Sequence, residues 1–266
     1  METSSSRPLK LVLATVAMLL ALVIAFYIGR ATAPTNSGSE LPSSIDQADS
    51  DSSATPDSAA LAPNQPTYSE SQTDENLVRL LTEQPRRDAD DPRALGDVNA
   101  PVVMVAYEDF SCPMCTKFFL ETYPHLKEYV DAGKLRIEFH DLVIFPNYGS
   151  NFAAHGSRAA AEQGKFWEFV ETAYRVAGAG NHPQYTAESV VEIAEKAGVP
   201  DLEKFRETMD SPETAEAVNA ESAHAMQKVG IQGTPFFIVN KAVITGALPV
   251  EYMTNTIDKQ LEEAGQ

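Results

Sequence analysis

A Cys-Pro-Met-Cys motif constrains this chain most, because Cys112 and Cys115 are the only two cysteines among 266 residues. An apolar run at residues 102–107 precedes the motif and predicts a buried strand, and a segment with helical spacing follows it. The pair is therefore expected at a strand-to-helix corner, where unpaired N–H groups and the helix dipole favour a thiolate. We expect Cys112, at the helix start, to be the nucleophile that solvent reaches, and Cys115, one turn further, to be shielded.

The N-terminus contains an uncharged apolar stretch at residues 11–28. At about 1.5 Å per residue, it is long enough to cross a hydrocarbon core of roughly 30 Å. We interpret it as a retained signal anchor, with residues 1–10 in the cytoplasm and the bulk of the chain outside the cell membrane. The alternative is a cleaved signal peptide with Ala-Thr-Ala at residues 31–33 as its cleavage site. Both interpretations place the rest of the chain in an exported compartment.

Residues 29–75 are rich in Ser, Thr, Ala, Pro and acidic side chains, and no Lys or Arg follows Arg30 in this stretch. Such a segment cannot bury a core, and we expect a disordered acidic linker. The formal net charge of the whole chain is −18. Phosphate binding needs clustered Lys and Arg, so nucleic acid is not expected as a partner. The folded domain is expected at residues 76–266.

The folded domain alternates strand and helix patterns. Helical spacing continues after the motif to Gly133, with a kink expected at Pro124, and residues 134–139 then alternate apolar and polar side chains as in a strand. Residues 148–230 are almost entirely helical in pattern. Two short β-rich runs, residues 236–239 and 242–245, and a closing amphipathic helix follow. The order is βαβ, a helical block, then ββα, which is an α/β fold.

This order resembles the thioredoxin fold interrupted by a helical insertion, and therefore the DsbA-like thiol–disulfide oxidoreductases. Four stretches are similar to membrane-anchored, Gram-positive-type members of that family: GDVNAPV at 96–102, EDFSCPMC at 108–115, EQGKFWE at 162–168 and GTPFFIVN at 233–240. The resemblance extends from about Leu95 to the C-terminus. It implies a thioredoxin domain with an all-helical insertion at about 148–230, preceded by a transmembrane anchor and a tether.

The resemblance also implies the other half of the site, a cis-proline at Pro235. The backbone of Thr234 would then lie beside the cysteines and pair with an extended substrate as a strand does. Between the cysteines, Pro113 suits a first helical turn, and Met114 is uncharged where strongly oxidising relatives have a histidine. We therefore expect a weaker oxidant than those relatives.

One position departs from the family pattern. Thioredoxins and many DsbA relatives have a buried acid six residues before the first cysteine, and this chain has Ala106 there. Glu108 and Asp109 lie closer to the corner, and either of them is a candidate for the missing proton carrier.

Two other roles for the motif remain open at this point. It supplies two of the four ligands that a structural zinc site needs, but the five histidines show no paired spacing such as HxxxH. A purely structural disulfide would close a loop too short to contribute much stability. We expect no metal and no cofactor.

The predicted function is therefore an exported thiol–disulfide oxidoreductase, tethered by its N-terminal helix, that introduces disulfides into newly exported, reduced proteins. The resemblance implies a quinone-coupled membrane protein of the DsbB or VKOR type as its reoxidant. A monomer is expected, since no dimerisation domain of the kind that isomerases carry is recognisable. The alternatives are a reductase or isomerase of the same fold, or a non-catalytic exported chaperone or metal carrier.

Overall fold

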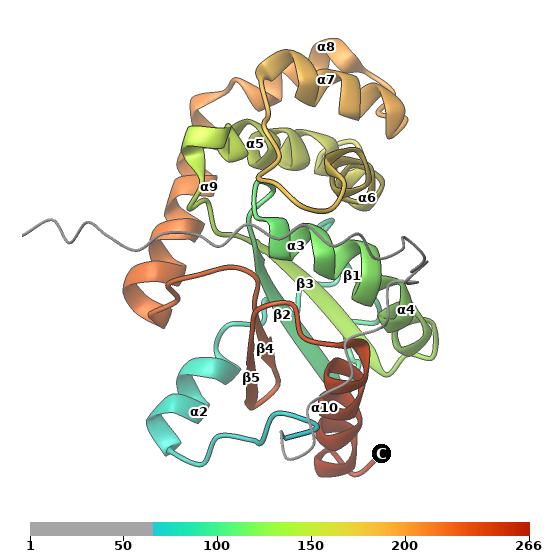
Figure 1. Ribbon diagram of the computed structural model, residues 1–266, viewed down its shortest axis with the longest axis vertical. Coiled ribbons are helices and arrows are strands. Elements are labelled where there is room, and N and C mark those ends of the chain that lie inside the picture. The colour runs from blue at the N-terminus through green and yellow to red at the C-terminus, as the bar shows by residue number, and fades with distance from the viewer. Residues whose placement is uncertain (1–65) are drawn as a thin grey trace, which may run out of the picture. The chain divides into compact units, whose positions relative to one another are not determined.

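The computed structural model describes residues 66–266 (Figure 1). The expected cytoplasmic tail, the anchor at residues 11–28 and most of the linker lie outside these residues. Within 66–266, no helix combines the length and the apolar character that crossing a membrane requires.

A five-stranded sheet forms the centre of the domain, in the order β1-β3-β2-β4-β5. The strands are β1 (Ala94–Leu95), β2 (Val102–Glu108), β3 (Leu135–Asp141), β4 (Phe236–Val239) and β5 (Ala242–Thr245). β2 and β3 are parallel, whereas β4 is antiparallel to both β2 and β5. The predicted strand-helix-strand unit and the hairpin are confirmed. The turn of that hairpin places Asn240 at a positive φ of 50°, which asparagine tolerates better than most residues. The short strand β1 was not predicted.

The helix after the motif is interrupted. It consists of α3 (Pro113–Lys117), a π-helical turn η1 (Phe118–Thr122) and α4 (Tyr123–Asp131). The N–H of Tyr123 bonds to the carbonyl oxygen of Phe118, five residues back, directly before Pro124. Because proline has no N–H to donate, the regular helical ladder cannot continue through this residue. The irregularity that the sequence predicts at Pro124 is therefore present as a widened turn.

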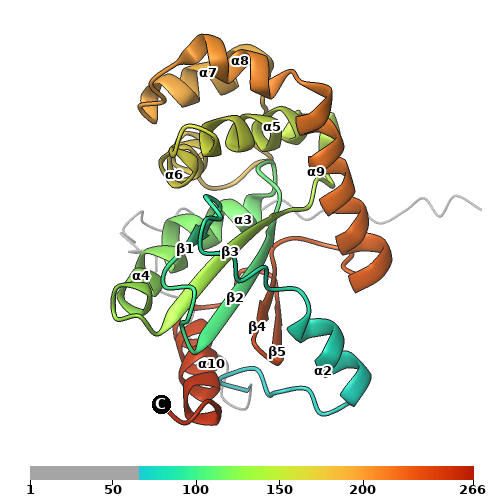
Figure 2. The ribbon, with the colours of Figure 1, turned by 180° about the vertical axis from the view of Figure 1, so that it is seen from behind.

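The helical insertion predicted for residues 148–230 is confirmed. After a short 3₁₀ turn η2 (Pro146–Tyr148), it comprises α5 (Ser150–Ala161), α6 (Phe166–Ala177), α7 (Ala187–Lys196), α8 (Leu202–Met209), α9 (Pro212–His224) and a π turn η3 (Ala225–Val229). Thr186, Asp201 and Ser211 are N-caps in this block, and the side chain of each accepts one or two backbone N–H groups of the following turn. Helices α5 to α8 lie together beyond the end of the sheet that carries the N-terminus of α3, and α9 runs back alongside the sheet (Figures 1 and 2).

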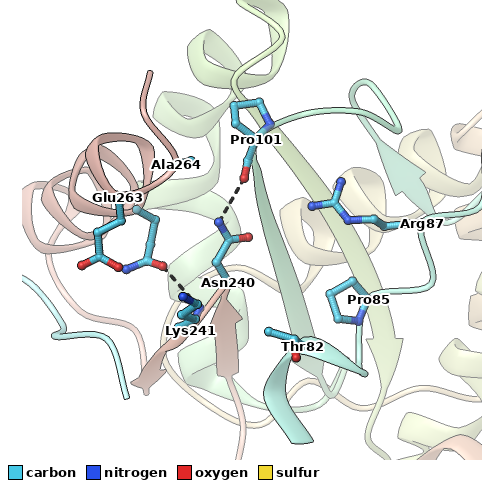
Figure 3. A pocket seen from close by; sticks show the side chains of 9 residues that line it. Thr82, Pro85, Arg87, Pro101, Asn240, Lys241, Glu263 and Ala264 are labelled. Carbon is cyan, nitrogen blue, oxygen red and sulfur yellow. Dashed lines mark hydrogen bonds between the residues drawn. The ribbon is translucent and has the colours of Figure 1, made fainter. Parts of the chain in front are cut away.

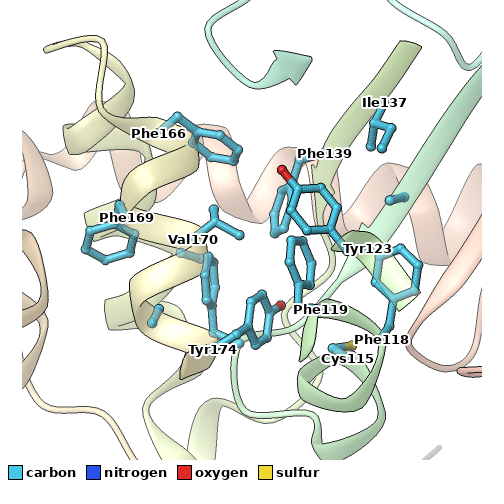
Figure 4. Packing of buried hydrophobic residues seen from close by; sticks show 14 of the residues in the cluster. Cys115, Phe118, Phe119, Tyr123, Ile137, Phe139, Phe166, Phe169, Val170 and Tyr174 are labelled. Atoms are coloured by element: carbon cyan, nitrogen blue, oxygen red, sulfur yellow. The ribbon is translucent and has the colours of Figure 1, made fainter. Parts of the chain in front are cut away.

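Both faces of the sheet are covered, and β2 is buried along its whole length. Alternate side chains such as Met104 point into the larger apolar cluster with α3, η1, the insertion and α10 (Val250–Glu263). The intervening ones, such as Val105, pack in a smaller cluster that includes Leu81 of α2 (Glu75–Thr82). Figure 4 shows the aromatic part of the larger cluster, where Phe119 and Phe139 lie close to Cys115.

Polar side chains on β3 are buried as well. Arg136 is 3% exposed and Glu138 is 0% exposed, and the two form an ion pair with 2.8 Å between Nε and Oε1. Glu138 also accepts the backbone N–H groups of Arg86 and Arg87 at 2.6 and 3.0 Å. The polar face of this strand is therefore covered by the segment that leads into β1.

The folded region begins earlier than residue 76, so the linker does not extend to residue 75 as expected. Ser71 forms an isolated antiparallel bridge with Ala242 of β5. The N–H of Ser69 donates to the hydroxyl of Thr256 on α10 at 2.9 Å. These backbone hydrogen bonds hold the segment against the domain, and its polar composition gave no sign of them.

Candidate active site

The two cysteines lie at the corner that the sequence predicts. Cys112 is the N-cap of α3, with extended backbone angles (φ −83°, ψ 120°), and Pro113 occupies the first helical turn. The backbone N–H of Cys112 donates to the carbonyl oxygen of Asp109 at 3.0 Å, which closes the turn after β2. Both cysteines are free thiols in this structure.

Thr234 lies directly beside Cys112. The Thr234–Pro235 peptide bond is cis, and the Cys112 thiol donates to the Thr234 carbonyl oxygen at 3.3 Å. Cys112 is only 3% exposed, so the prediction that solvent reaches it freely is wrong for this dithiol form.

The surroundings of Cys112 favour its ionised form. Its pKa is lowered to about 6, mainly by the Cys115 thiol, and also by Thr234 and by the N–H groups of Cys115 and Met114, while burial opposes the shift. These two N–H groups belong to the first turn of α3, where no helical carbonyl is available to them. Cys112 is therefore a good nucleophile and a good leaving group near neutral pH.

Cys115 has the opposite character. It is 0% exposed, and burial raises the pKa of its thiol well above the ordinary value, with further increases from Cys112 and from the charge of Glu108. Two thiols two residues apart therefore differ strongly in acidity. The arrangement suits an attack at Cys112 and a proton-dependent step at Cys115.

Glu108 and Asp109 are both 1% exposed but have different surroundings. Asp109 accepts the backbone N–H of Ser111 at 2.7 Å and those of Ile144 and Phe145 at 2.8 and 3.0 Å. These three hydrogen bonds occupy its carboxylate and fix the turn after β2 against the segment that follows β3.

Glu108 has no such anchors. Neither of its oxygens has a hydrogen-bond donor among the described residues, and the Cys115 thiol is the group that comes nearest to acting as one. Burial, followed by the charges of Cys112 and Asp109, raises its pKa well above the usual range, while the Cys115 thiol opposes the shift. Glu108 lies two residues after Ala106 and hence on the same face of β2. The structure thus places a protonatable carboxyl beside Cys115 despite Ala106.

Sequence reasoning missed Tyr174 of α6. Its buried hydroxyl lacks a hydrogen-bond partner within residues 66–266, and its ring stacks on Phe119 and Phe110 at centroid distances of 4.3 and 5.3 Å (Figure 4). Burial, and then the charges of Cys115 and Glu108, raise its pKa. The tyrosine belongs to an insertion helix, and only the fold brings it behind the cysteines.

Sequence reasoning also missed His182 and Tyr185, which lie in the loop between α6 and α7. The Nδ1 atom of His182 is 2.7 Å from the carbonyl oxygen of Ser111, and the Tyr185 hydroxyl donates to the carbonyl oxygen of Phe110 at 3.3 Å. No periodicity or motif marks this loop, so no signal in the sequence could have identified it.

A cavity of about 300 Å³ lies away from the cysteines, between the end of α2, the β4–β5 turn and α10 (Figure 3). Its polar groups serve the fold: the Asn240 amide donates to the Pro101 carbonyl oxygen at 3.0 Å, and Arg87 donates to the carbonyl oxygens of Val98 and Ala100. Within residues 66–266, no group of three or more His, Cys, Asp or Glu side chains is arranged to hold a metal ion.

Known proteins are similar to this chain in sequence. The chain is 32% identical over 182 residues to the probable disulfide bond formation protein D of Bacillus cereus, covering 64% of this chain and 79% of that protein. It is 29% identical to disulfide bond formation protein D of Bacillus subtilis, covering 63% of this chain and 76% of the relative.

Solved structures agree with the sequence comparison. The crystal structure of oxidised BdbD from Bacillus subtilis superposes with a TM-score of 0.58 at 28% identity, covering 64% of this chain and 92% of that one. The sequence profile of the family described as Thioredoxin matches residues 88–259. The chain therefore belongs to the thioredoxin family and, within it, to the DsbA-like thiol–disulfide oxidoreductases that resemble disulfide bond formation protein D.

Proposed function

We propose that this protein introduces disulfide bonds into exported proteins through reversible oxidation of Cys112 and Cys115. The observation that carries the proposal is the difference between the two thiols: the pKa of Cys112 is lowered, and that of Cys115 is raised. In addition, the Cys112 thiol contacts the Thr234 carbonyl. A structural disulfide would not need one acidic thiol and one shielded thiol. An exchanging pair does, because one sulfur must be attacked and released while the other is protonated.

The reaction starts from the oxidised enzyme. A substrate thiolate attacks the sulfur of Cys112, a new S–S bond forms, and the Cys112–Cys115 bond breaks. Cys115 leaves as a thiolate with a high proton affinity, and the protonated carboxyl of Glu108 supplies the proton. A second substrate thiolate then attacks the substrate sulfur of the mixed disulfide, which releases the Cys112 thiolate and the oxidised substrate.

Thr234 and Pro235 form the substrate side of the site. In the dithiol form, the Thr234 carbonyl oxygen accepts a hydrogen bond from the Cys112 thiol. Neither a thiolate nor a disulfide sulfur has a proton to donate, so in the oxidised enzyme this carbonyl is free for a substrate N–H. The Thr234 backbone then pairs with an extended segment beside the reacting sulfur, as an added strand would.

Pro113 and Met114 adjust the strength of the oxidant. Pro113 presets the first turn of α3, and the uncharged side chain of Met114 is 42% exposed. The low pKa of Cys112 stabilises the reduced enzyme and so favours oxidation of the substrate. A positively charged residue at position 114 would add to this effect. The uncharged Met114 keeps a weaker redox pair, a reductase or isomerase, as the second candidate function.

We place the protein at the cell membrane, with residues 11–28 as a single-pass anchor, the linker outside, and the catalytic domain extracytoplasmic. Reduced enzyme must be returned to the disulfide form, and we propose a quinone-coupled membrane protein of the DsbB or VKOR type for this step. The domain acts as a monomer. The name of the Bacillus relatives, disulfide bond formation protein, supports the direction of the reaction.

The direct experiment is a single-turnover transfer from the oxidised, purified chain to a reduced, unfolded protein. Stoichiometric disulfide formation is expected, and Cys112→Ala should abolish it. If a Cys112→Ala/Cys115→Ala double variant kept the cellular role, the protein would instead be a chaperone or carrier that does not use its thiols.

A further inference from the structure

The loop between α6 and α7 contacts the active-site turn at two consecutive carbonyl groups. His182 Nδ1 lies 2.7 Å from the carbonyl oxygen of Ser111, and the Tyr185 hydroxyl donates to that of Phe110 at 3.3 Å. Ser111 directly precedes Cys112 and is 0% exposed. A loop of the insertion therefore contacts the backbone that leads into the nucleophile.

The peptide unit between Ser111 and Cys112 is held at both ends. Its N–H donates to the carbonyl oxygen of Asp109 at 3.0 Å, and its carbonyl oxygen meets His182. A carbonyl oxygen only accepts hydrogen bonds, so Nδ1 of His182 carries a proton in this contact. With both groups bonded, the peptide plane that orients Cys112 cannot rotate without breaking a hydrogen bond.

The imidazole ring is itself fixed. It stacks on the ring of Tyr148 with centroids 4.5 Å apart and an angle of 12°, and the ring of Phe145 lies 4.5 Å away at 58°. The N–H of Tyr185 donates to the carbonyl oxygen of Tyr148 at 2.9 Å. A Cβ at Gly149 would collide with the Tyr185 carbonyl oxygen, so the loop packs tightly on this segment. The donor is thus oriented before substrate binds.

We propose that His182 is a positioning residue for the exchange reaction at Cys112: by holding the Ser111 carbonyl, it keeps the Cys112 sulfur in front of the N–H groups of the first turn of α3. Those groups, from Met114 and Cys115, stabilise the thiolate only while the sulfur faces them. The inference rests on the proposed function, since it assigns a role in the same chemistry. His182 does not touch the reacting sulfur and acts through the backbone.

Two substitutions separate the hydrogen bond from the ring packing. His182→Phe keeps a flat ring against Tyr148 but removes the donor. His182→Asn keeps an N–H close to the position of Nδ1 but loses most of the ring. His125→Phe is the matched control, because this histidine is exposed on α4. The measurements are the pH profile of iodoacetamide alkylation of the reduced full-length chain, and the rate of disulfide transfer to a synthetic peptide with two cysteines.

A hydrogen bond of about 1 kcal/mol corresponds to roughly a fivefold change in an equilibrium. We expect His182→Phe to reduce the ratio of thiolate to thiol at Cys112 at pH 6, and the transfer rate, by about fivefold. His182→Asn should restore both to within twofold of the unmodified chain, and His125→Phe should change neither. Thermal unfolding checks that each variant is folded.

A folded His182→Phe variant with an unchanged alkylation profile would overturn the inference, as would a His182→Asn variant no better than His182→Phe. If His182→Phe does not fold, His182→Asn decides alone, since the inference requires it to keep the alkylation profile of the unmodified chain. Failure of the unmodified chain to oxidise the peptide would instead count against the proposed function, because the alkylation profile does not depend on turnover.

Discussion

The thiol of Cys112 donates to the carbonyl oxygen of Thr234 across 3.3 Å, although 122 positions separate the two residues in the chain. This contact joins the strand-to-helix corner after β2 to the loop before β4. It brings the nucleophile and the backbone group proposed to bind substrate to one point. The expected reactivity of the site follows mainly from the groups that lie close to this contact.

The acidity of Cys112 can be measured directly. With a pKa of about 6, its thiolate should dominate at pH 7, and alkylation of the reduced protein should have its midpoint near pH 6. The lowered pKa stabilises the folded reduced form fully above the thiol's ordinary value of 9.0, and this contribution is lost as the pH falls through about 6. A midpoint near pH 9 would show that neither the Cys115 thiol nor the N–H groups of the first turn of α3 stabilise this thiolate.

Glu108→Gln tests the proton donor. The amide has nearly the shape of the protonated acid but cannot transfer a proton, so single-turnover reduction of the enzyme disulfide should slow by about tenfold or more. Glu128→Gln, on an exposed position of α4, is the matched control and should leave the rate unchanged.

Glu108→Gln is also expected to change the stability of the fold. Burial raises the pKa of Glu108, so the ionisable acid opposes folding above the usual carboxyl range, and this cost is absent at lower pH. Glu108→Gln should therefore unfold at an equal or higher temperature at pH 7. If Glu108→Gln unfolded at a lower temperature than the unmodified chain, its slower reaction would be explained by lost stability, which would contradict the assignment of Glu108 as proton donor.

Asp109→Ala should behave differently from Glu108→Gln. It leaves the N–H groups of Ser111, Ile144 and Phe145 without their acceptor. Each buried donor left unpaired costs about 1–3 kcal/mol, so we expect the free energy of unfolding to fall by about 3 kcal/mol. Urea unfolding measures this change, and a loss below about 1 kcal/mol would show that solvent or other groups replace the carboxylate.

Glu221 of α9 is expected to be a stability residue with no part in the exchange chemistry. Its carboxylate pairs with Arg86, Arg93 and Arg158 at 3.1, 2.7 and 2.7 Å and accepts the N–H of Asp141 at 2.9 Å. Burial opposes ionisation, but these cations and His140 hold its pKa below the usual range. Its contribution is therefore present at neutral pH and is lost only in acid.

Glu221→Ala removes a carboxylate shared by three partly buried arginines, each of which keeps a second partner in Asp91 or Asp141. The free energy of unfolding should therefore fall by about 3 kcal/mol, at the lower end of the range for breaking a buried ion pair. At a temperature where the variant remains folded, the alkylation midpoint of Cys112 should not move. A shifted midpoint would show that the cluster is coupled to the active site.

Local patterns were sufficient to predict most helices and strands. Ser211 followed by Pro212, or Asp201 before an amphipathic run, specifies a helix start through its own hydrogen bonds, and the structure shows each of these caps. The strand β2 was equally clear because it is apolar throughout. The two-residue strand β1 was not, because its pairing with β3 depends on a segment far away in sequence.

The chemical surroundings of the site were harder to predict. Cys112, Cys115 and Pro235 belong to motifs, but His182, Tyr185 and Tyr174 act through contacts that exist only once the insertion packs over α3. Burial also cannot be read from residue type alone. Glu108 and Asp109 are adjacent acids, and only the positions of the backbone N–H groups show that one is anchored and the other is free.

The redox equilibrium between the purified chain and glutathione tests the central claim most directly. An enzyme that introduces disulfides, with a Cys112 pKa of about 6, should be reduced more readily than protein disulfide isomerase, which means a potential above about −180 mV. Because Met114 is uncharged, the value should remain below the strongly oxidising limit of about −120 mV. A potential near about −270 mV, as in thioredoxin, would contradict the account and assign the same two cysteines to a reductase.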